Sequence, residues 1–387
     1  MTTGNLDAAL TRAGSDQSKR YLWTLSLLVA GAPAVASATL LATGWTWIAL
    51  TPLLFYYVVV PVLDMAVGED PYNPDEADLE RLAADRWFTG LLVAAVAVYY
   101  VSFLTSAYAA ATADLPFLIF VALALGAGAA SGSALAVGHE LGHRTNRFGK
   151  IAALFANGLS GYAHFRIEHN QGHHVAVATP EDSASARLGE SVWRFACREI
   201  PGGVARAWKL ESRRLRARGG RVWSLENEIL QGWAFSAVIA GLLIAWLGPI
   251  AIAFLMLHQV SAWLQLTFAN YVEHYGLLRA RRENGRYEPC QPKHSWNSNH
   301  IVSNLMLFHL QRHSDHHANP MAHYQTLRNF PGLPSLPNGY PGCFVLAAVP
   351  PLWFKVMDEK ALAWADGDPA RLNVAPHAAK RYAARAV

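Results

Sequence analysis

The sequence predicts an all-α integral membrane protein with six transmembrane helices in three hairpins and a cytoplasmic region rich in histidine. Three observations support this fold class. The 387 residues are 52% hydrophobic but only 16% charged, whereas soluble domains are usually nearer a quarter charged. Six apolar segments approach the roughly 20 residues that a helix needs to cross a bilayer. All 32 lysines and arginines lie outside these segments.

The six segments come in three pairs, and short turns separate the members of a pair. Thr43, Gly44 and Trp45 lie between the first two segments, and Gly248 and Pro249 lie between the last two. Each pair is therefore expected to form a helical hairpin. The expected spans occupy residues 22–43, 46–66, 87–109, 115–138, 232–247 and 249–271.

The basic residues are distributed unevenly between the loops. Three lie in residues 1–20, two in 67–86, 14 in 144–230 and 13 in 273–387. By the positive-inside rule, both termini and all the large loops are expected on the cytoplasmic side of the membrane. We expect one membrane domain over residues 1–387 without a cleaved signal peptide, because the N-terminal stretch is polar. Residues 144–230 would be a cytoplasmic insert and 273–387 a cytoplasmic C-terminal region.

The three cysteines limit the kinds of metal site that the chain could form. Cys197, Cys290 and Cys343 lie far apart, and the sequence contains no Cys-x-x-Cys pair. Zinc-ribbon, rubredoxin and iron–sulfur sites are therefore excluded for this sequence. Few, unpaired cysteines suit a reducing compartment.

A basic segment in the large insert is consistent with two kinds of partner. Between residues 206 and 221 there are seven basic residues and one acidic residue, Glu211, with Trp208 among them. Such a segment suits an interfacial helix on anionic headgroups or a docking face for an acidic electron-transfer protein. Nothing else in the sequence supports nucleic-acid binding. The basic residues are Arg206, Lys209, Arg213, Arg214, Arg216, Arg218 and Arg221.

Four histidine clusters are the strongest functional signal. They occupy residues 139–143, 168–174, 270–276 and 313–317. The first and third lie at the cytoplasmic ends of the fourth and sixth expected spans, so all four clusters can meet in one layer beside the bilayer. Neutral imidazole is the commonest nitrogen ligand for transition metals. The candidate ligands are His139, His143, His169, His173, His174, His274, His313, His316 and His317.

The number and spacing of these histidines predict two metal ions. His139 and His143, four residues apart, share one face of a helix. Neighbouring helical side chains diverge by about 100°, so the adjacent pairs 173–174 and 316–317 are expected to divide between two metals. Calcium and magnesium prefer oxygen ligands, and zinc prefers four ligands. Two irons fit nine histidines best, and copper fits the ligand type.

Seven other histidines lie apart from the clusters and are expected to be ordinary hydrogen-bonded side chains. His258 falls inside the sixth expected span, where we expect a neutral, hydrogen-bonded ring. His309, four residues before His313, is the closest alternative ligand. The seven are His164, His258, His294, His300, His309, His323 and His377.

These motifs resemble those of the membrane alkane 1-monooxygenases (alkane omega-hydroxylases), a family of the histidine-box non-haem diiron superfamily. The superfamily also includes fatty-acyl desaturases and xylene monooxygenase. The resemblance runs from Tyr21 to Trp353, nearly the whole chain. Its most specific segments are Glu168–His174, Asn270–Gly276 and Ser295–Asn319. Arg144 stands where the family commonly has lysine, outside the ligand set.

The resemblance implies that the histidine-rich region is catalytic. Two iron ions would use O₂ as co-substrate to hydroxylate the terminal methyl of medium- to long-chain n-alkanes, giving 1-alkanols. Rubredoxin, itself reduced by rubredoxin reductase, would supply the electrons. Some relatives carry a fused rubredoxin, which this sequence does not show. By analogy with related enzymes, one iron would take His139, His143, His174 and His317. The other would take His169, His173, His274, His313 and His316.

Carboxylates beside the ligands are candidates for orienting the imidazoles, since metal-bound histidines commonly donate their second N–H to such groups. Each one could equally be a solvated or helix-capping residue. The candidates are Glu140, Glu168, Glu273 and Asp315, with Asp182 as a further one.

An aromatic group on the second span is the candidate lining of a substrate channel. An alkane dissolves in the bilayer and offers no polar group, so cavity shape must set the chain length. Phe55, Tyr56 and Tyr57 could line such a cavity, or they could pack between helices at the membrane interface.

Three other functions remain open from the sequence. A fatty-acyl desaturase or fatty-acid hydroxylase would use the same kind of metal site. Residues 139–143 read His-Glu-Leu-Gly-His, which matches the helix signature of zinc metalloproteases but leaves the other clustered histidines unexplained. A metal transporter or sensor would place its ligands along a path through the membrane rather than in one layer.

Overall fold

The computed structural model describes residues 19–144 and 146–384. Helices dominate, and β-structure in this part of the chain is limited to isolated bridges such as Glu69 with His300. Six helices are long and apolar enough to cross a membrane, which confirms the predicted number of spans. Arg12, in the polar N-terminal stretch, lies outside the described residues. The six spans are Arg20–Thr43, Thr46–Val67, Arg86–Thr112, Phe117–Gly142, Glu228–Leu247 and Ile250–His274.

The first two spans are built from several short helical pieces, and the other four are continuous. The first contains α2 (Lys19–Leu22), η1 (Trp23–Leu25) and α3 (Ser26–Thr43). The second contains η2 (Thr46–Leu50), α4 (Thr51–Leu54), the π-helical turn η3 (Phe55–Val59) and α5 (Val60–Val67). The continuous spans are α7 (Arg86–Thr112), α8 (Phe117–Gly142), α13 (Glu228–Leu247) and α14 (Ile250–His274).

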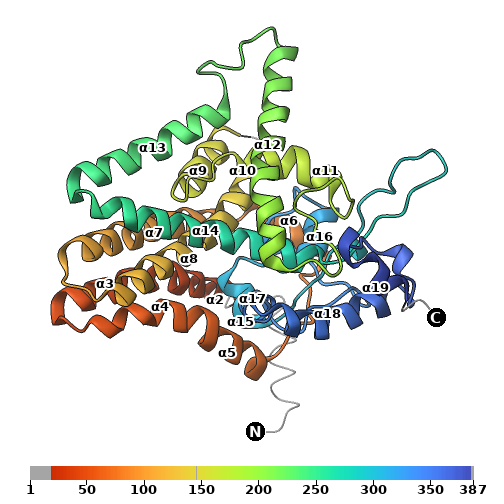
Figure 1. Cartoon of the computed structure of the whole chain (residues 1–387), viewed down its shortest axis with the longest axis horizontal. Coiled ribbons are helices and arrows are strands. Elements are labelled where there is room, and N and C mark those ends of the chain that lie inside the picture. Colours follow the sequence, from red (N-terminus) through yellow and green to blue (C-terminus); the bar gives the residue numbers. More distant parts are fainter. Residues whose placement is uncertain (1–18, 145, 385–387) are drawn as a thin grey trace.

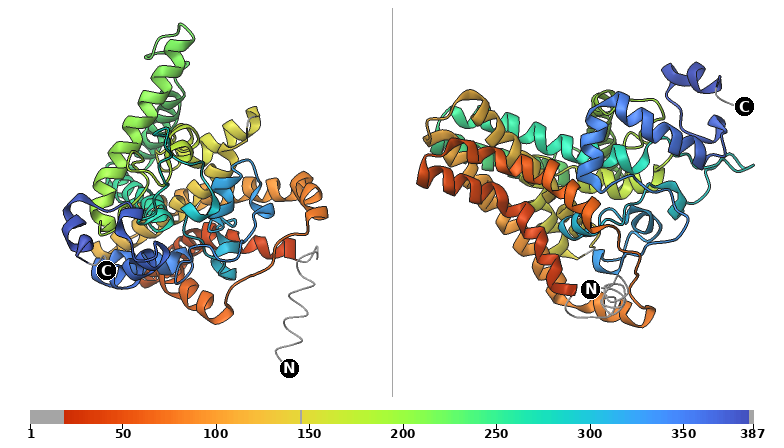
Figure 2. Two further views of the ribbon diagram at one scale, coloured as in Figure 1. Left: turned by 90° about the vertical axis from the view of Figure 1, so that its right-hand side faces the viewer. Right: turned by 90° about the horizontal axis from the view of Figure 1, so that it is seen from below.

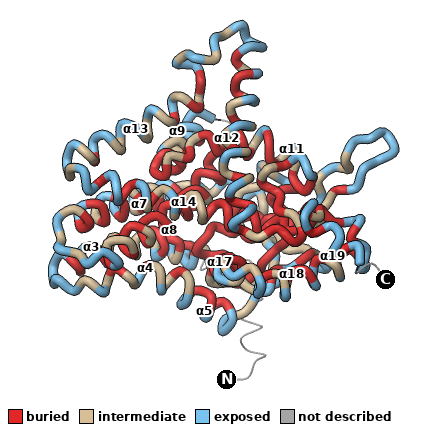
Figure 3. Tube along the Cα trace, viewed as in Figure 1, coloured by how far each residue is buried: buried red, intermediate tan, exposed pale blue. Residues whose placement is uncertain are grey.

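The remaining elements lie mainly at one end of the bundle, where they form a cap (Figures 1 and 2). In the first half of the chain they are α6 (Glu76–Ala84), α9 (Arg147–Gly158), α10 (Phe165–Glu168), the π-helical turn η4 (His169–His173), α11 (His174–Ala176) and α12 (Val192–Ala217). In the second half they are η5 (Pro292–His294), α15 (Ile301–Met306), α16 (His313–Ala318), η6 (Tyr324–Thr326), α17 (Tyr340–Ala348), α18 (Pro350–Trp364), η7 (Pro369–Arg371), η8 (Pro376–Ala378) and α19 (Ala379–Ala383). Buried residues concentrate where this cap meets the spans (Figure 3).

Helix α8 is the centre of the bundle because its small side chains let neighbouring helices approach closely. It is 78% buried over its apolar window, against 17% for α13. A Cβ atom on Gly128 would lie 2.3 Å from the carbonyl oxygen of His258 in α14, and one on Gly132 would lie 2.4 Å from Cβ of Gln265. Two glycines four residues apart allow helices to pack closely in a membrane. Such packing drives helix association there, because lipid provides no hydrophobic driving force between helices. The contact fixes the end of α8 beside the end of α14.

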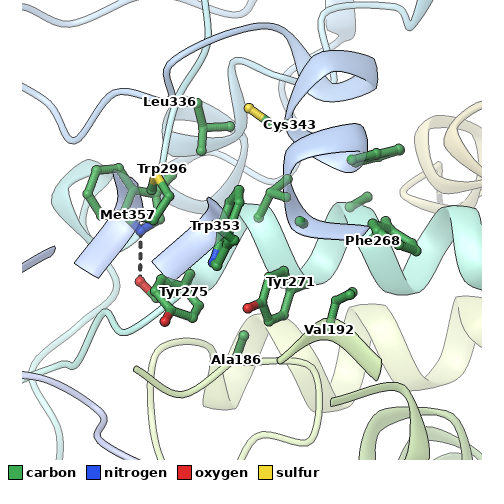
Figure 4. Close-up of a cluster of buried hydrophobic side chains, with 14 of the residues drawn as sticks. Ala186, Val192, Phe268, Tyr271, Tyr275, Trp296, Leu336, Cys343, Trp353 and Met357 are labelled. Atoms are coloured by element: carbon green, nitrogen blue, oxygen red, sulfur yellow. Dashed lines mark hydrogen bonds between the residues drawn. The ribbon is translucent and has the colours of Figure 1, made fainter. Parts of the chain in front are cut away.

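An aromatic cluster fastens the cap to the end of α14 (Figure 4). Tyr271 and Tyr275 pack against Trp353, with ring centroids 5.2 and 5.4 Å apart. The indole Nε1 of Trp296 donates to the backbone oxygen of Tyr275 at 2.8 Å. Helices α17 and α18, which bring Trp353 to this cluster, meet at a bend of 119°. The last turn of α14 is thus buried on the side of the cap.

Replacing Gly128 with alanine tests the close contact between α8 and α14. Because the new methyl group would overlap a backbone oxygen, we expect a loss of about 1–3 kcal/mol in the free energy of unfolding. The melting temperature of the purified protein in detergent measures this loss. Gly241→Ala in α13, where nothing lies within 4 Å of the new Cβ, is the control and should not lower it. Equal melting temperatures for both variants would contradict the contact.

Candidate metal centre

All nine predicted ligands converge at the cap end of the bundle. His139 and His143 come from the end of α8, and His274 is the last residue of α14. The second cluster is carried by η4 and α11, and the fourth by α16. His143 and His174 are half-buried, and the other seven are buried. Four segments far apart in sequence therefore bring their imidazoles into one protected layer.

The imidazoles form two groups, each with its nitrogen atoms within 4.8 Å of one another. In the first, His174 Nε2 lies 3.0 Å from His169 Nε2 and 3.1 Å from His316 Nε2. In the second, His313 Nε2 lies 3.2 Å from His274 Nε2. The first group contains His139, His143, His169, His174 and His316, and the second contains His173, His274, His313 and His317.

The spacing between these nitrogen atoms is that of ligands around a metal. Five Nε2–Nε2 distances within the two groups range from 2.8 to 3.4 Å. Nitrogens bound at about 2.0–2.1 Å to one ion lie about 3.0 Å apart at right angles and about 3.4 Å apart at tetrahedral angles. A ring nitrogen of a neutral imidazole either donates or accepts one hydrogen bond, so His174 Nε2 cannot bond both His169 Nε2 and His316 Nε2. Each group of residues fits one metal ion.

The division between the groups differs from the expected one at three of the nine histidines. The adjacent pairs 173–174 and 316–317 do divide, as the divergence of neighbouring side chains predicts. The π-helical turn η4 explains the difference at His169. In a π-helix, residues five apart approach one face, so His169 joins His174 rather than His173. The expectation assumed α-helical geometry through this segment.

Helix α16 accounts for the other two differences. His313 and His317 are four residues apart and their Nε2 atoms lie 2.8 Å apart, so both belong to the second group. His316 turns to the first group, where its ring centroid lies 4.3 Å from that of His139. The helix therefore contributes to both groups, as expected, but pairs its histidines at four residues rather than three.

One carboxylate orients a ligand directly. Asp182 Oδ2 lies 2.8 Å from Nδ1 of His173 and accepts a hydrogen bond from the hydroxyl of Ser185 at 2.6 Å. With Nδ1–H donating to Asp182, the lone pair of His173 is on Nε2, which has no hydrogen-bond partner among the described residues. Although burial would raise its pKa, the hydrogen bond from His173 and the positive charge of Arg206 hold the pKa of Asp182 far below its usual value. Asp182 therefore stays ionised and keeps this ring in the metal-binding tautomer.

Arg206 belongs to this site and is not free for docking. Its guanidinium donates to Asp182 Oδ1 at 2.6 Å and also contacts Glu168. Its side chain is 18% exposed. Arg214, also predicted to face a partner, is instead paired with the buried Glu211 at 2.6 Å. These two corrections arise because a basic run does not show which of its residues face inward; the exposed members are Lys209, Arg213, Arg216, Arg218 and Arg221.

The comparisons with known proteins agree with this site. A family model described as fatty acid desaturase matches residues 113–331. The alkane 1-monooxygenase of Pseudomonas putida is 46% identical over 356 residues, which cover 92% of this chain and 89% of that protein. The alkane 1-monooxygenase of Ectopseudomonas oleovorans is 47% identical over the same shares. The chain belongs to the alkane 1-monooxygenase family. The xylene/toluene monooxygenase hydroxylase component of Pseudomonas putida is 28% identical over 59% of this chain and 60% of that protein.

The other predicted carboxylates have different partners in this family member. Glu273 Oε2 lies 3.2 Å from His313 Nε2, on the metal-facing nitrogen rather than behind the ring. Glu140 contacts Nδ1 of His323 at 3.4 Å. Asp315 accepts from the backbone N–H of Arg328 at 2.8 Å and from the side chain of Asn319, so it anchors the segment after α16 rather than a ligand. Glu168 contacts Arg206, as described above.

A cavity leads to the histidines from within the bundle. Tyr56, in the π-helical turn η3, lines it together with His139, His169 and His313. The cavity is narrow, with a volume of about 40 Å³, and its other walls are mainly apolar. Of the three predicted channel residues, Tyr56 lines this cavity. Phe55 and Tyr57 do not line it; they are partly buried and pack against the hydrophobic cluster that contains Tyr56.

Two polar residues near the cavity were not predicted from the sequence. Gln265, an amide within the apolar span α14, lines the cavity and accepts a hydrogen bond from Tyr57 at 2.7 Å. Its position in an apolar run was the signal that could have found it. Glu199 of α12 is buried and accepts hydrogen bonds from Thr267 and Asn270 at 2.8 and 3.1 Å. Because α12 contains both acidic and basic residues, the sequence did not distinguish Glu199 from exposed charged side chains. Burial raises the pKa of Glu199 to about 7.

The histidines outside the clusters lie outside both ligand groups. His258 Nε2 is 2.8 Å from the hydroxyl of Ser131, the hydrogen-bonded arrangement expected for this span. His309 packs against Trp23 with ring centroids 4.3 Å apart. The zinc-metalloprotease alternative is not supported, because His139 and His143 share their group with three further histidines.

Asp182→Asn tests the role of the carboxylate behind His173. Removing its charge weakens its hold on the metal-binding tautomer, and we expect metal affinity to fall about 10- to 100-fold. Metal retained per chain after dialysis against graded chelator concentrations measures this affinity. Glu211→Gln, which breaks a buried ion pair away from the imidazoles, controls for general destabilisation. An unchanged retention curve for Asp182→Asn would rule out the orienting role.

Proposed function

We propose that this protein hydroxylates the terminal methyl group of medium- to long-chain n-alkanes. One atom of O₂ enters the terminal C–H bond to give a 1-alkanol, and the other leaves as water with two electrons and two protons. The observation that carries the proposal is a two-group histidine site next to a mainly apolar cavity, which lies where the membrane spans meet the cap. Relatives named alkane 1-monooxygenase, at 46 and 47% identity over 92% of the chain, support the same activity.

Two irons are the proposed occupants of the histidine groups. One group offers five imidazoles, which exceeds the four ligands that zinc prefers, and the other offers four. When bound, the irons would supply the redox chemistry with O₂ that an unactivated C–H bond requires. The protein holds the ligands in a dry layer, and Asp182 keeps His173 oriented toward its group.

The substrate is proposed to reach the site from the bilayer. One side of the cavity is formed by α8, α14 and the turn η3, which are parts of membrane spans, and cap elements form the other side. Three of the histidines line it. An alkane needs no polar recognition, so the walls select by length and shape. Tyr56 closes part of this cavity and is the proposed residue that limits chain length.

The family resemblance supports a proposal for the electron donor, and the distribution of basic residues supports one for the orientation in the membrane. We propose rubredoxin, reduced by its reductase, as the donor. The cap carries most of the basic residues, which favours its placement on the cytoplasmic side of the bacterial inner membrane. The termini would then also be cytoplasmic.

The proposed function predicts a specific product and metal content. Protein reconstituted in lipid vesicles with rubredoxin, rubredoxin reductase and n-octane should form 1-octanol and contain two irons per chain. Gas chromatography of the products and elemental analysis measure the two quantities. Preferred oxidation of a fatty-acyl substrate would instead favour a desaturase or fatty-acid hydroxylase, and a single zinc would exclude the proposal.

Tyr56→Ala should extend the range of alkanes that the protein accepts. Removing the phenol ring enlarges the cavity, and we expect the ratio of dodecane to octane oxidation to rise about tenfold. Val58→Ala is the matched control, since Val58 lies in the same turn and is 52% exposed on the outer surface of the bundle. Competition assays with both alkanes provide the ratio. An unchanged ratio in the Tyr56 variant would show that this ring does not limit chain length.

A further inference from the structure

The second half of α12 and the loop after it project beyond the bundle. Helix α12 runs across the cap end of the spans, and its C-terminal part extends sideways past them (Figures 1 and 2). We call residues 209–227 the α12–α13 arm. Its outer end is exposed (Figure 3). No described element covers the side chains at this end, so their chemistry indicates what they meet.

The arm is strongly basic on its exposed surface. The arm contains two acidic residues. Glu211 in α12 is 1% exposed and paired with Arg214, whereas Glu226 in the loop is exposed. This surface therefore attracts anionic groups. The exposed basic side chains are Lys209, Arg213, Arg216, Arg218 and Arg221.

Large apolar side chains lie among these charges. Trp223 is 75% exposed and Leu225 is 92% exposed. The indole of Trp223 lies 5.0 Å from that of Trp208, which in turn stacks on Trp233 at 6.1 Å with planes 8° apart. A continuous row of indoles therefore runs from the loop to the beginning of α13. Tryptophan in such a position is characteristic of the boundary between membrane and water.

The position of the arm along the chain places it at the level of the bilayer surface. Leu225 lies three residues before Glu228, where the span α13 begins. Asn227 caps this helix by accepting from the backbone N–H groups of Ile229 and Leu230. At about 1.5 Å per helical residue, Trp233 lies only about 8 Å into the span. The exposed basic and apolar side chains therefore lie where phospholipid headgroups meet the hydrocarbon.

We propose that the α12–α13 arm is a binding surface for anionic phospholipids. The arginines contact the phosphate groups, and Trp223 and Leu225 insert at the boundary of the acyl chains. An acidic soluble protein is the less favoured occupant, because the apolar side chains would stay exposed and the surface lies within the headgroup layer. Arg206 is not part of this surface, since it faces the metal centre.

Lipid selectivity of the full-length protein in nanodiscs tests the proposal. Nanodiscs contain equal amounts of phosphatidylglycerol and phosphatidylcholine, and native mass spectrometry counts the lipids of each kind that each chain retains. We expect preferential retention of phosphatidylglycerol. Arg216→Gln, Arg218→Gln and Arg221→Gln together should reduce the preference at least about fivefold, with unchanged metal content showing that the chain is folded.

A matched triple variant separates this surface from positive charge in general. Arg281→Gln, Arg282→Gln and Arg286→Gln remove three exposed basic side chains from the loop after α14 and should leave the preference unchanged. Equal preferences in the arm variant and the unmodified chain would overturn the proposal. So would an arm variant that keeps its lipid preference but requires a higher rubredoxin concentration for half-maximal turnover, because the arm would then be a protein-docking surface.

Discussion

Nine imidazole rings directed at two points are the constraint on which the structure depends. Without a metal, nitrogen atoms about 3 Å apart with too few protons to share repel one another, so contacts elsewhere must hold the rings in place. The Gly128 and Gly132 contacts fix α8 against α14. Arg312, 1% exposed, donates to the backbone oxygens of Leu327, Asp70 and Tyr72, which ties the start of α16 to the loop after the second span. The metal centre is thus preformed by packing remote from it.

The sequence was sufficient for the spans and the ligands because both depend on composition and short-range spacing. Apolar length predicts a span whatever its neighbours are, and His139 and His143 share a face in any α-helix. It was not sufficient for the division of the ligands. Whether His169 joins His173 or His174 depends on the hydrogen-bond register of one turn, and a sequence read with α-helical geometry places the rings incorrectly. Such π-helical turns are frequent at functional sites.

Charge was the least predictable property for a related reason. The count of basic residues in α12 is a property of sequence, but their direction depends on how the helix is seated. Arg206 and Arg213 are seven residues apart on the same helix, yet one is held between Glu168 and Asp182 and the other is exposed. A buried ion pair adds little net stability, because the cost of desolvating its charges offsets much of their attraction. Its main effect is to fix the orientation of the paired side chains. The role of Arg206 is therefore to hold Asp182 behind His173.

An apolar cavity and a buried group of charged side chains contact different imidazoles of the site. The apolar cavity is lined by His139, His169 and His313, whereas the charged contacts of Asp182 and Arg206 act on His173. The cavity wall also includes Glu273, whose Oε2 lies 3.2 Å from His313 Nε2. Neither Asp182 nor Arg206 lines the cavity, so a nonpolar chain inside it would not displace their ion pair. The charges stay fixed because their partners are buried protein groups rather than water. This separation lets one protein combine a membrane-soluble substrate with a metal centre that needs ionised groups to orient its ligands.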